Sequence, residues 1–131
     1  MHGSLAQCFN MHDTALKHAR LFFETYVPSG DGLKIVEIGS QDVNGSLREV
    51  APASASYLGL DFCAGKGVDL VIADPYSLPV TDNYADVCVS SSCFEHSEFF
   101  WLSFLEIVRI TKLAGFIYIN VPSNGPIHQY P

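Results

Sequence analysis

The chain alternates between short runs of apolar, largely β-branched residues and longer segments of different periodicity. Short apolar runs that end at glycine, proline or an acidic residue predict buried strands. Since these runs are separated by segments of helical or loop character, their order predicts an α/β protein with a parallel sheet and right-handed connections. The five expected strands are residues 33–38, 56–61, 68–73, 85–90 and 116–121.

Apolar residues recur at helical spacing in residues 13–26, so this segment is expected to be an amphipathic helix. Asp13 is its candidate N-cap, and Pro28 lies just beyond its end. Residues 1–12 show no periodicity and are expected to be a flexible lead-in. The chain of 131 residues has the size of a single domain. We divide it into the lead-in 1–12, a helix at 13–27, a core at 33–121 and a tail at 122–131.

A second helix is expected at residues 99–113, with Ser97 as its N-cap and Gly115 just beyond its end. This segment has a wide apolar face, which predicts packing against the sheet. A shorter helical piece is expected at residues 46–50, closed by Pro52.

The composition favours a folded domain, because 48% of the residues are hydrophobic, 16% are charged and the mean hydropathy is +0.20. The formal net charge is −7, and no cluster of lysine or arginine is present, which disfavours nucleic acid and anionic membranes as partners. No apolar run approaches the roughly 18 residues that a membrane-spanning helix needs. The sequence also lacks the pattern of a signal peptide, so we expect a cytoplasmic protein.

Cysteine and histidine show no metal-binding spacing. The cysteines have no Cys-x-x-Cys pair and two lie in or beside expected strands, as reduced buried cysteines do. The histidines form no pair at helical spacing, so we predict no metal site. The residues concerned are Cys8, Cys63, Cys88, Cys93, His2, His12, His18, His96 and His128.

Acidic residues stand at the ends of three consecutive expected strands: Glu37, Asp61 and Asp74. In an open parallel sheet, ligands bind at the carboxyl ends of the strands. Asp61 follows Gly39 by 22 positions, close to the roughly 20 that separate a glycine turn from a ribose-binding acid. The alternatives are a Glu37 satisfied by backbone amides and an Asp61 that caps a turn.

In order and spacing, four segments resemble the class I S-adenosylmethionine-dependent methyltransferases, and the resemblance covers about residues 33–124. The segments are Val-Glu-Ile-Gly-Ser at 36–40, Tyr-Leu-Gly-Leu-Asp at 57–61, Ala-Asp-Pro-Tyr-Ser-Leu-Pro at 73–79 and Tyr-Ala-Asp-Val-Cys-Val-Ser-Ser-Ser-Cys-Phe-Glu-His at 84–96. The resemblance implies a three-layer α/β/α sandwich with a Rossmann-like, mainly parallel sheet of about five strands in the order 3-2-1-4-5. It also implies S-adenosylmethionine as cofactor and methyl transfer as activity.

The resemblance assigns the first two strand ends to the methionine and ribose parts of the cofactor. Glu37, Gly39 and Ser40 would border the methionine part. Asp61 would accept hydrogen bonds from the ribose hydroxyls, and Phe62 would lie beside the adenine. A pocket of carboxylates and turn amides complements a ligand that carries a sulfonium and an amino group, whereas the carboxylates there would disfavour a pyrophosphate.

The resemblance assigns the next two strand ends to the adenine edge and the substrate side. Asp74 and Pro75 would stand at the adenine edge, and Ser90 and Ser91 would line the cofactor opposite the substrate. Methyl transfer from an already activated sulfonium requires mainly alignment of the acceptor and exclusion of water. His96 is the one candidate for a general base, and its alternative role is to pair with a neighbouring glutamate.

Two departures from the family pattern stand out. The second glycine of the usual turn is replaced by Gln41, which is expected to weaken cofactor binding. The family's seven-stranded sheet continues beyond strand five, whereas this chain stops at Pro131, so we expect a fold truncated relative to the family. Strand five would then be an exposed edge through which the chain forms homo-oligomers.

The sequence is also compatible with two other functions. A nicotinamide-dependent oxidoreductase also has a glycine turn and an acidic second strand end, but the turn here lacks Gly-x-Gly-x-x-Gly and has Glu37 near the expected pyrophosphate. The other alternative is a non-catalytic methyltransferase-like domain that binds cofactor or mediates association. The methyl acceptor is not defined by the sequence.

Overall fold

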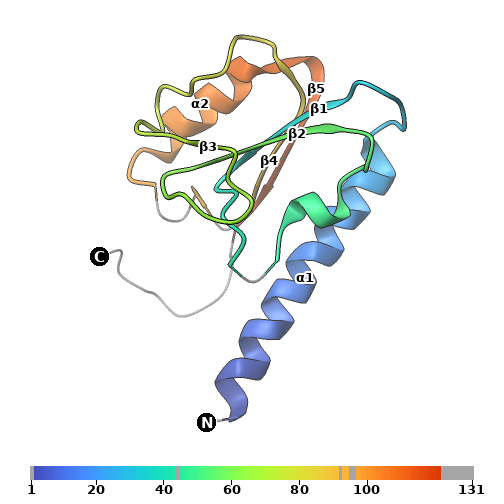
Figure 1. The fold of residues 1–131 in the computed structure, drawn as a ribbon, viewed down its shortest axis with the longest axis vertical. Helices are drawn as coiled ribbons and strands as arrows, with labels where there is room; N and C mark the ends of the chain where they lie inside the picture. The colour runs from blue at the N-terminus through green and yellow to red at the C-terminus, as the bar shows by residue number, and fades with distance from the viewer. Residues whose placement is uncertain (1, 44, 92, 95–96, 122–131) are drawn as a thin grey trace.

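A computed structural model describes residues 2–43, 45–91, 93–94 and 97–121 (Figure 1). It contains two α-helices, a single turn of 3-10 helix (η1) and five strands. In chain order these are α1 (His2–Tyr26), β1 (Lys34–Ile38), η1 (Leu47–Val50), β2 (Ser56–Asp61), β3 (Leu70–Val71), β4 (Ala85–Ser91), α2 (Phe100–Ile110) and β5 (Thr111–Asn120).

The five strands form one sheet in the order β3-β2-β1-β4-β5, and each neighbouring pair is parallel. The order confirms the expected Rossmann-like topology. Strand β1 lies in the centre, where Ile35 is in register with Tyr57 of β2 and Val87 of β4. Both edges of β1 are therefore paired. Its residues also lie in buried cores on both faces of the sheet, which explains why its apolar run is continuous rather than alternating.

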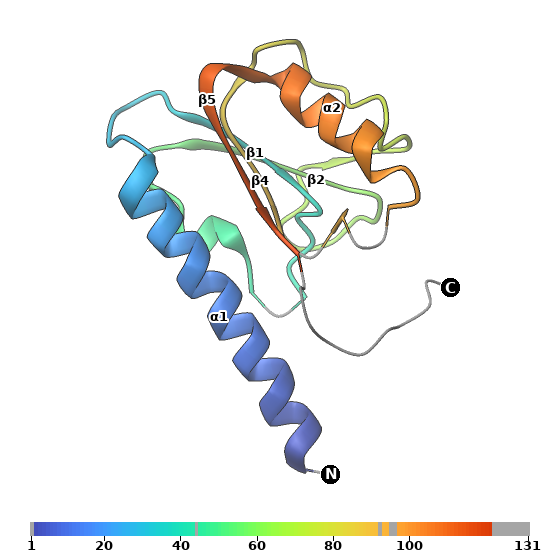
Figure 2. The same cartoon turned by 180° about the vertical axis from the view of Figure 1, so that it is seen from behind.

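Helices cover both faces of the sheet, so the fold is the expected three-layer sandwich (Figure 2). One face packs against α1 and η1 through a core of seven buried residues, Ala19, Phe23, Val27, Ile35, Leu47, Val87 and Val89. The other face packs against α2 through Val36, Ile38, Leu60, Ile72, Leu78, Ala85, Cys88, Ile107 and Ile110. Successive residues of β1 alternate between the two cores, which places Glu37 on the same face as Ile35.

Helix α1 begins earlier than the sequence pattern predicted. It runs from His2, so the expected lead-in 1–12 is helical from its second residue, and Asp13 lies inside the helix rather than at its N-cap. The buried residues Ala19, Phe23 and Val27 recur every four positions and face the sheet. The end of α1 nearest the N-terminus projects past the sheet (Figures 1 and 2).

Helix α2 is shorter than expected at both ends. Its N-cap is Phe99 rather than Ser97, and no side chain caps it. It ends at Ile110 because Thr111 already enters β5, where the hydroxyl of Thr111 donates a hydrogen bond to the carbonyl oxygen of Ile107 at 2.6 Å. Strand β5 therefore begins five residues before the predicted position and follows the helix directly.

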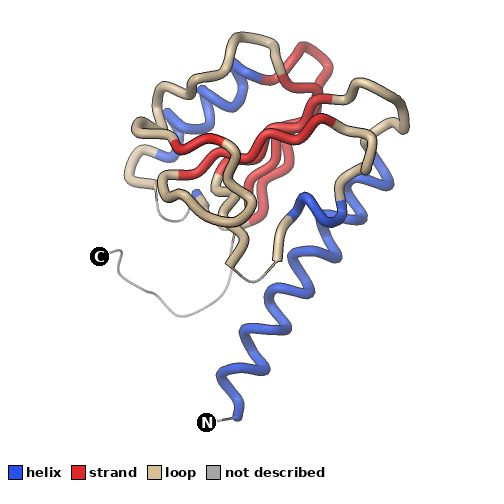
Figure 3. Tube along the Cα trace, viewed as in Figure 1, coloured by secondary structure: helices blue, strands red, loops and turns tan. Residues whose placement is uncertain are grey.

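Strand β3 is also shorter than the expected 68–73, since only Leu70 and Val71 pair with β2 (Figure 3). The turn at residues 46–50 matches its prediction: Ser46 is the N-cap of η1, and its Oγ accepts a hydrogen bond from the Arg48 amide. Because η1 is a single turn, only a short element covers β1 and β2 beside α1.

Several large apolar side chains of α2 are exposed to solvent. The exposed set on and beside this helix is Phe99, Phe100, Trp101, Leu102, Phe104, Leu105 and Val108, with exposed fractions of 39% to 60%. Helix α2 buries Ser103, Ile107 and Ile110 against the sheet. The helix thus has apolar residues on both its covered and its uncovered sides.

Candidate functional site

The turn after β1 is held against the end of β2. The amides of Gly39 and Ser40 both donate to the carbonyl oxygen of Leu60, at 2.9 and 3.1 Å. Gly39 has a φ of 79°, a conformation that favours glycine, and a Cβ there would lie 2.9 Å from Cβ of Cys93. Gly39 is therefore required both by its backbone conformation and by the close approach of the segment after β4.

Glu37 is a buried carboxylate, only 4% exposed, at the end of β1. The Tyr57 hydroxyl donates a hydrogen bond to its Oε2 at 2.6 Å. Burial raises the pKa of Glu37 from its ordinary value near 4.5 to about 7, although Tyr57 and Arg48 act to lower it. Near neutral pH this carboxyl can change its charge in response to a ligand.

A second set of contacts supports Tyr57 from η1 and from the residue just before β3. The Arg48 guanidinium lies over the Tyr57 ring at 4.7 Å from its centroid and forms an ion pair with Asp69. Asp69 also accepts a hydrogen bond from the Gly59 amide at 2.7 Å. Burial acts to raise the pKa of Asp69, but the Gly59 amide and Arg48 lower it below its usual range. Asp69 therefore stays ionised beside Arg48.

Asp61 lies at the end of β2 and is half-buried. Its Oδ2 accepts a hydrogen bond from the Gln41 amide at 2.9 Å, and its Oδ1 accepts one from the Cys63 amide at 3.3 Å. A carboxylate can accept about four hydrogen bonds, so capacity for ligand hydroxyls remains. Phe62 follows with 48% of its surface exposed. The parallel pairing of β1 and β2 places Asp61 beside the turn that follows Glu37, where it accepts the Gln41 amide.

The other predicted residues have local roles in the fold. Asp74 is exposed, and its Oδ1 accepts a hydrogen bond from the Tyr76 amide at 2.8 Å, which makes it a turn cap beside the half-buried Pro75. Ser90 is buried and donates to the carbonyl oxygen of Ile38 at 3.0 Å, so it ties β4 to β1. Ser91 accepts a hydrogen bond from Asn120 of β5. His96 lies outside the described residues.

The donor and acceptor set at the first two strand ends fits a cofactor with an amino group, a sulfonium and ribose hydroxyls. Glu37 and Asp61 supply negative charge on either side of the Gly39 turn. Ser40 adds a polar atom, because its Oγ is buried and no residue that the structure describes forms a hydrogen bond with it. The residues present therefore fit the cofactor that the sequence resemblance implied.

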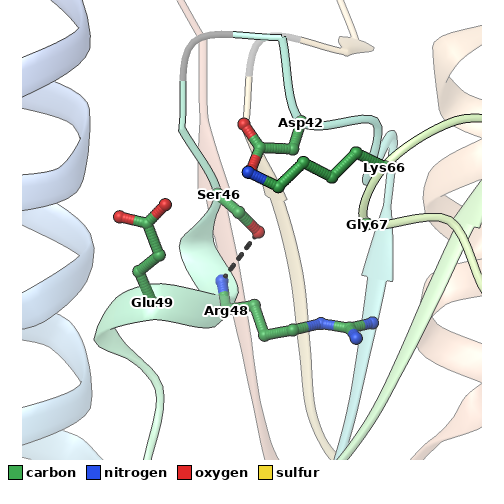
Figure 4. Close-up of a pocket in the computed structure, with 6 residues that line it drawn as sticks. All are labelled: Asp42, Ser46, Arg48, Glu49, Lys66 and Gly67. Carbon is green, nitrogen blue, oxygen red and sulfur yellow. Dashed lines mark hydrogen bonds and ion pairs between the residues drawn. The ribbon is translucent and has the colours of Figure 1, made fainter.

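A cavity of about 410 Å³ lies beside this region (Figure 4). It is lined by Asp42, Ser46, Arg48, Glu49, Lys66 and Gly67, none of which was predicted as a site residue. Figure 4 shows the Lys66 side chain reaching toward Asp42, with which it forms an ion pair at 3.4 Å. Two acidic and two basic side chains give this cavity no net charge. The cavity adjoins the turn after Gly39, since Asp42 of this turn donates a backbone hydrogen bond to the carbonyl oxygen of Lys66, and both residues line the cavity.

The described part of the chain has neither a cluster of metal-ligating side chains nor a helix that could span a membrane. Within it, no group of three or more histidine, cysteine, aspartate or glutamate side chains could hold a metal ion. Within the same residues, no helix is both long enough and apolar enough to cross a membrane.

A comparison with protein families identifies the family to which the chain belongs. A family model described as a methyltransferase domain matches residues 37–119, which is more than half of the chain. The chain therefore belongs to the class I S-adenosylmethionine-dependent methyltransferase family. No curated protein sequence matches it.

Solved structures show the same fold. A protein from Methanococcus maripaludis, described as a candidate S-adenosylmethionine-dependent methyltransferase, has a TM-score of 0.63 and 24% identity, over 79% of this chain and 53% of that one. A candidate methyltransferase of Haloferax volcanii, solved in complex with a methyltransferase activator, has a TM-score of 0.66 and 22% identity, over 91% and 56%. The cyclase SpnF has a TM-score of 0.64 and 19% identity, over 80% and 44%. The chain thus spans about half the length of these structures, and identities this low show the fold alone.

Sequence reasoning missed the residues that surround Glu37. Tyr57 was noted only as part of a strand, and Arg48 only as part of a short helical piece. The contact between Glu37 and Tyr57 depends on the parallel register of β1 and β2, which no local pattern specifies. The one available signal was Gly59, because a glycine inside a strand indicates a close backbone approach. Gly59 pairs with Glu37, and a Cβ there would lie 2.3 Å from the carbonyl oxygen of Gly67.

Proposed function

We propose that this chain binds S-adenosylmethionine at the carboxyl ends of β1 and β2 and transfers its methyl group to an acceptor. The observation that carries the proposal is the pair of carboxylates, Glu37 and Asp61, on either side of the Gly39 turn in a chain of this family. When bound, S-adenosylmethionine would supply an activated methyl group on a sulfonium. Glu37 would hold the cationic methionine part, and Asp61 would accept hydrogen bonds from the ribose hydroxyls.

The remaining predicted residues complete the proposed site. Phe62 would cover one face of the adenine and Asp74 would border its edge. On the side of β4, Ser91 would face the cofactor, while Ser90 fixes the end of β4 against β1 through its bond to Ile38. His96 stays the candidate base for an acceptor that must lose a proton. We also keep a cytoplasmic location and self-association through the edge of β5 as parts of this proposal.

The test is calorimetric titration of the chain with S-adenosylmethionine and S-adenosylhomocysteine, with NAD as a control ligand. Asp61→Asn should weaken binding about tenfold or more, since a hydrogen bond to a charged group contributes about 1.5–3 kcal/mol. Asp31→Asn is the matched control, because Asp31 is exposed and precedes the opposite end of β1. Binding of NAD alone, or equal affinity of the Asp61→Asn variant, would contradict the proposal.

A second candidate function is a non-catalytic domain that binds the cofactor or mediates association. The observation that favours it is the exposed apolar side of α2, which would suit association with another molecule. Transfer of radiolabelled methyl groups into a mixed set of acceptors separates the two functions. Cofactor binding with no transfer to any acceptor would favour the non-catalytic function.

A further inference from the structure

The carboxylate of Glu37 is held by a layered set of contacts that no part of the proposed site explains. Oε2 accepts the Tyr57 hydroxyl at 2.6 Å, whereas no residue that the structure describes forms a hydrogen bond to Oε1. Among the described residues, Tyr57 thus fixes one oxygen, while the other keeps its capacity to accept. This is the arrangement expected of a carboxylate that is oriented toward a ligand.

Tyr57 acts as the donor in this contact. Burial, together with the charge of Glu37, raises the pKa of the Tyr57 hydroxyl far above its usual range, so the phenol keeps its proton at any physiological pH. Its ring is in turn fixed by the Arg48 guanidinium, 4.7 Å from the ring centroid. Arg48 is anchored by Asp69, which is itself held by the Gly59 amide. The contacts thus run from the edge of the sheet to Glu37.

We propose that Tyr57 is a positioning residue, backed by Arg48, that orients the Glu37 carboxylate and keeps it charged for the cationic methionine part of the cofactor. The inference rests on the proposed function, because it concerns the same site. It goes beyond it by assigning a role to a residue on β2 that would not itself touch the cofactor.

The charge of Glu37 depends on groups from every element around it. From β2, Tyr57 stabilises the carboxylate, and from η1 the Arg48 guanidinium does so through its charge. Other acidic groups and burial act in the opposite direction. The titratable and charged groups that interact with Glu37 are Tyr57, Arg48, Asp61, Asp42 and Cys88.

The sign of the expected pH dependence follows from this balance. The cationic ligand requires the ionised form of Glu37, and the pKa of Glu37 is about 7. Affinity should therefore fall as pH drops through 7, by about tenfold between pH 8 and pH 6. Tyr57→Phe removes the hydrogen bond to the carboxylate and raises the pKa of Glu37 further. If the pKa rises by about one, affinity at pH 7 falls about fivefold, and the loss disappears near pH 9.

The experiment is calorimetric titration with S-adenosylmethionine from pH 6 to pH 9 on the wild-type chain, Tyr57→Phe and Tyr84→Phe. Tyr84 is a matched control, because its half-buried ring also lies 4.7 Å from a cation, Lys34, but near the opposite end of the sheet. A loss confined to Tyr57→Phe and to lower pH supports the inference. A loss of equal size at every pH, or none, overturns it while leaving the proposed function standing.

The effect of Tyr57 on Glu37 can also be measured without the cofactor. Carbon NMR of the Glu37 carboxyl in the ligand-free chain gives its pKa in all three proteins. If the pKa of Glu37 is raised in Tyr57→Phe but not in Tyr84→Phe, the proposed role of Tyr57 is supported. An unchanged pKa of Glu37 in Tyr57→Phe overturns it. Failure of the wild-type chain to bind S-adenosylmethionine at any pH would overturn the proposed function instead.

Discussion

Glu37 should lower the stability of the folded chain at neutral and alkaline pH, and Glu37→Gln should reverse this. Gln has nearly the same shape and can still accept the Tyr57 hydrogen bond, but it does not ionise. In the folded wild type the carboxyl has a pKa of about 7, against about 4.5 when exposed in the unfolded chain. The folded state therefore binds its proton more tightly than the unfolded state does.

The linkage between proton binding and folding gives the direction and size of this change in stability. Between these two pKa values the unfolded chain has fewer protons bound than the folded chain, so the free energy of unfolding falls as pH rises. The full difference corresponds to about 3 kcal/mol, at 1.36 kcal/mol for each pKa unit. Because part of it is already present at pH 5, the stability of Glu37→Gln relative to wild type should rise by about 2.5 kcal/mol between pH 5 and pH 8.5.

Urea unfolding followed by circular dichroism at pH 5, 7 and 8.5 measures this difference. Glu49→Gln is the matched control, because Glu49 is exposed in η1, close in sequence to Arg48. The reasoning is refuted if the relative stability of Glu37→Gln is the same at all three pH values, or if it falls as pH rises. In the same variant, binding of S-adenosylmethionine should be lost, so stability and ligand binding would change in opposite directions.

Two further changes test the packing that positions the site. Gly59→Ala should destabilise the fold by about 1–3 kcal/mol in urea unfolding, because the new Cβ would lie 2.3 Å from the carbonyl oxygen of Gly67. The control Gly30→Ala should be close to neutral, because no atom lies within 4 Å of a Cβ at that position. Similar losses in both variants would contradict this reasoning. Arg109→Met should speed amide hydrogen exchange in residues 78–82, since Arg109 donates to the carbonyl oxygens of Leu78 and Val80 at 3.0 and 2.8 Å. Unchanged exchange there would show that these hydrogen bonds do not hold the segment in place.

The sheet could be predicted from the sequence because its strands are short apolar runs with clear ends. The element ends that were wrong lie where the tertiary structure decides between two local options. Thr111 and Lys112 are compatible with one more helical turn, but Lys112 pairs instead with Asp86 of β4 at 3.0 Å, within the sheet. The start of α1 was missed because Asp13 is a good N-cap by type, yet it lies within a longer helix.

The candidate site could be proposed from the sequence only at single strand ends. The positions of Glu37 and Asp61 follow from the sequence, because each ends an apolar run near a glycine. The contact of Tyr57 with Glu37 joins residues 20 positions apart, and it exists only because β1 and β2 are parallel neighbours. Residue type alone also could not show that Ser90 is tied to the backbone of β1.

The exposed apolar side of α2 has a spectroscopic consequence. Trp101 is the only tryptophan of the chain, and 51% of its surface is exposed beside Phe99 and Phe100. Its fluorescence is therefore dominated by water at the outer surface of the molecule, on a different element from Glu37 and Asp61. A blue shift of the emission on mixing with another molecule would report that α2 has been covered, whereas a ligand at the ends of β1 and β2 could bind without changing it.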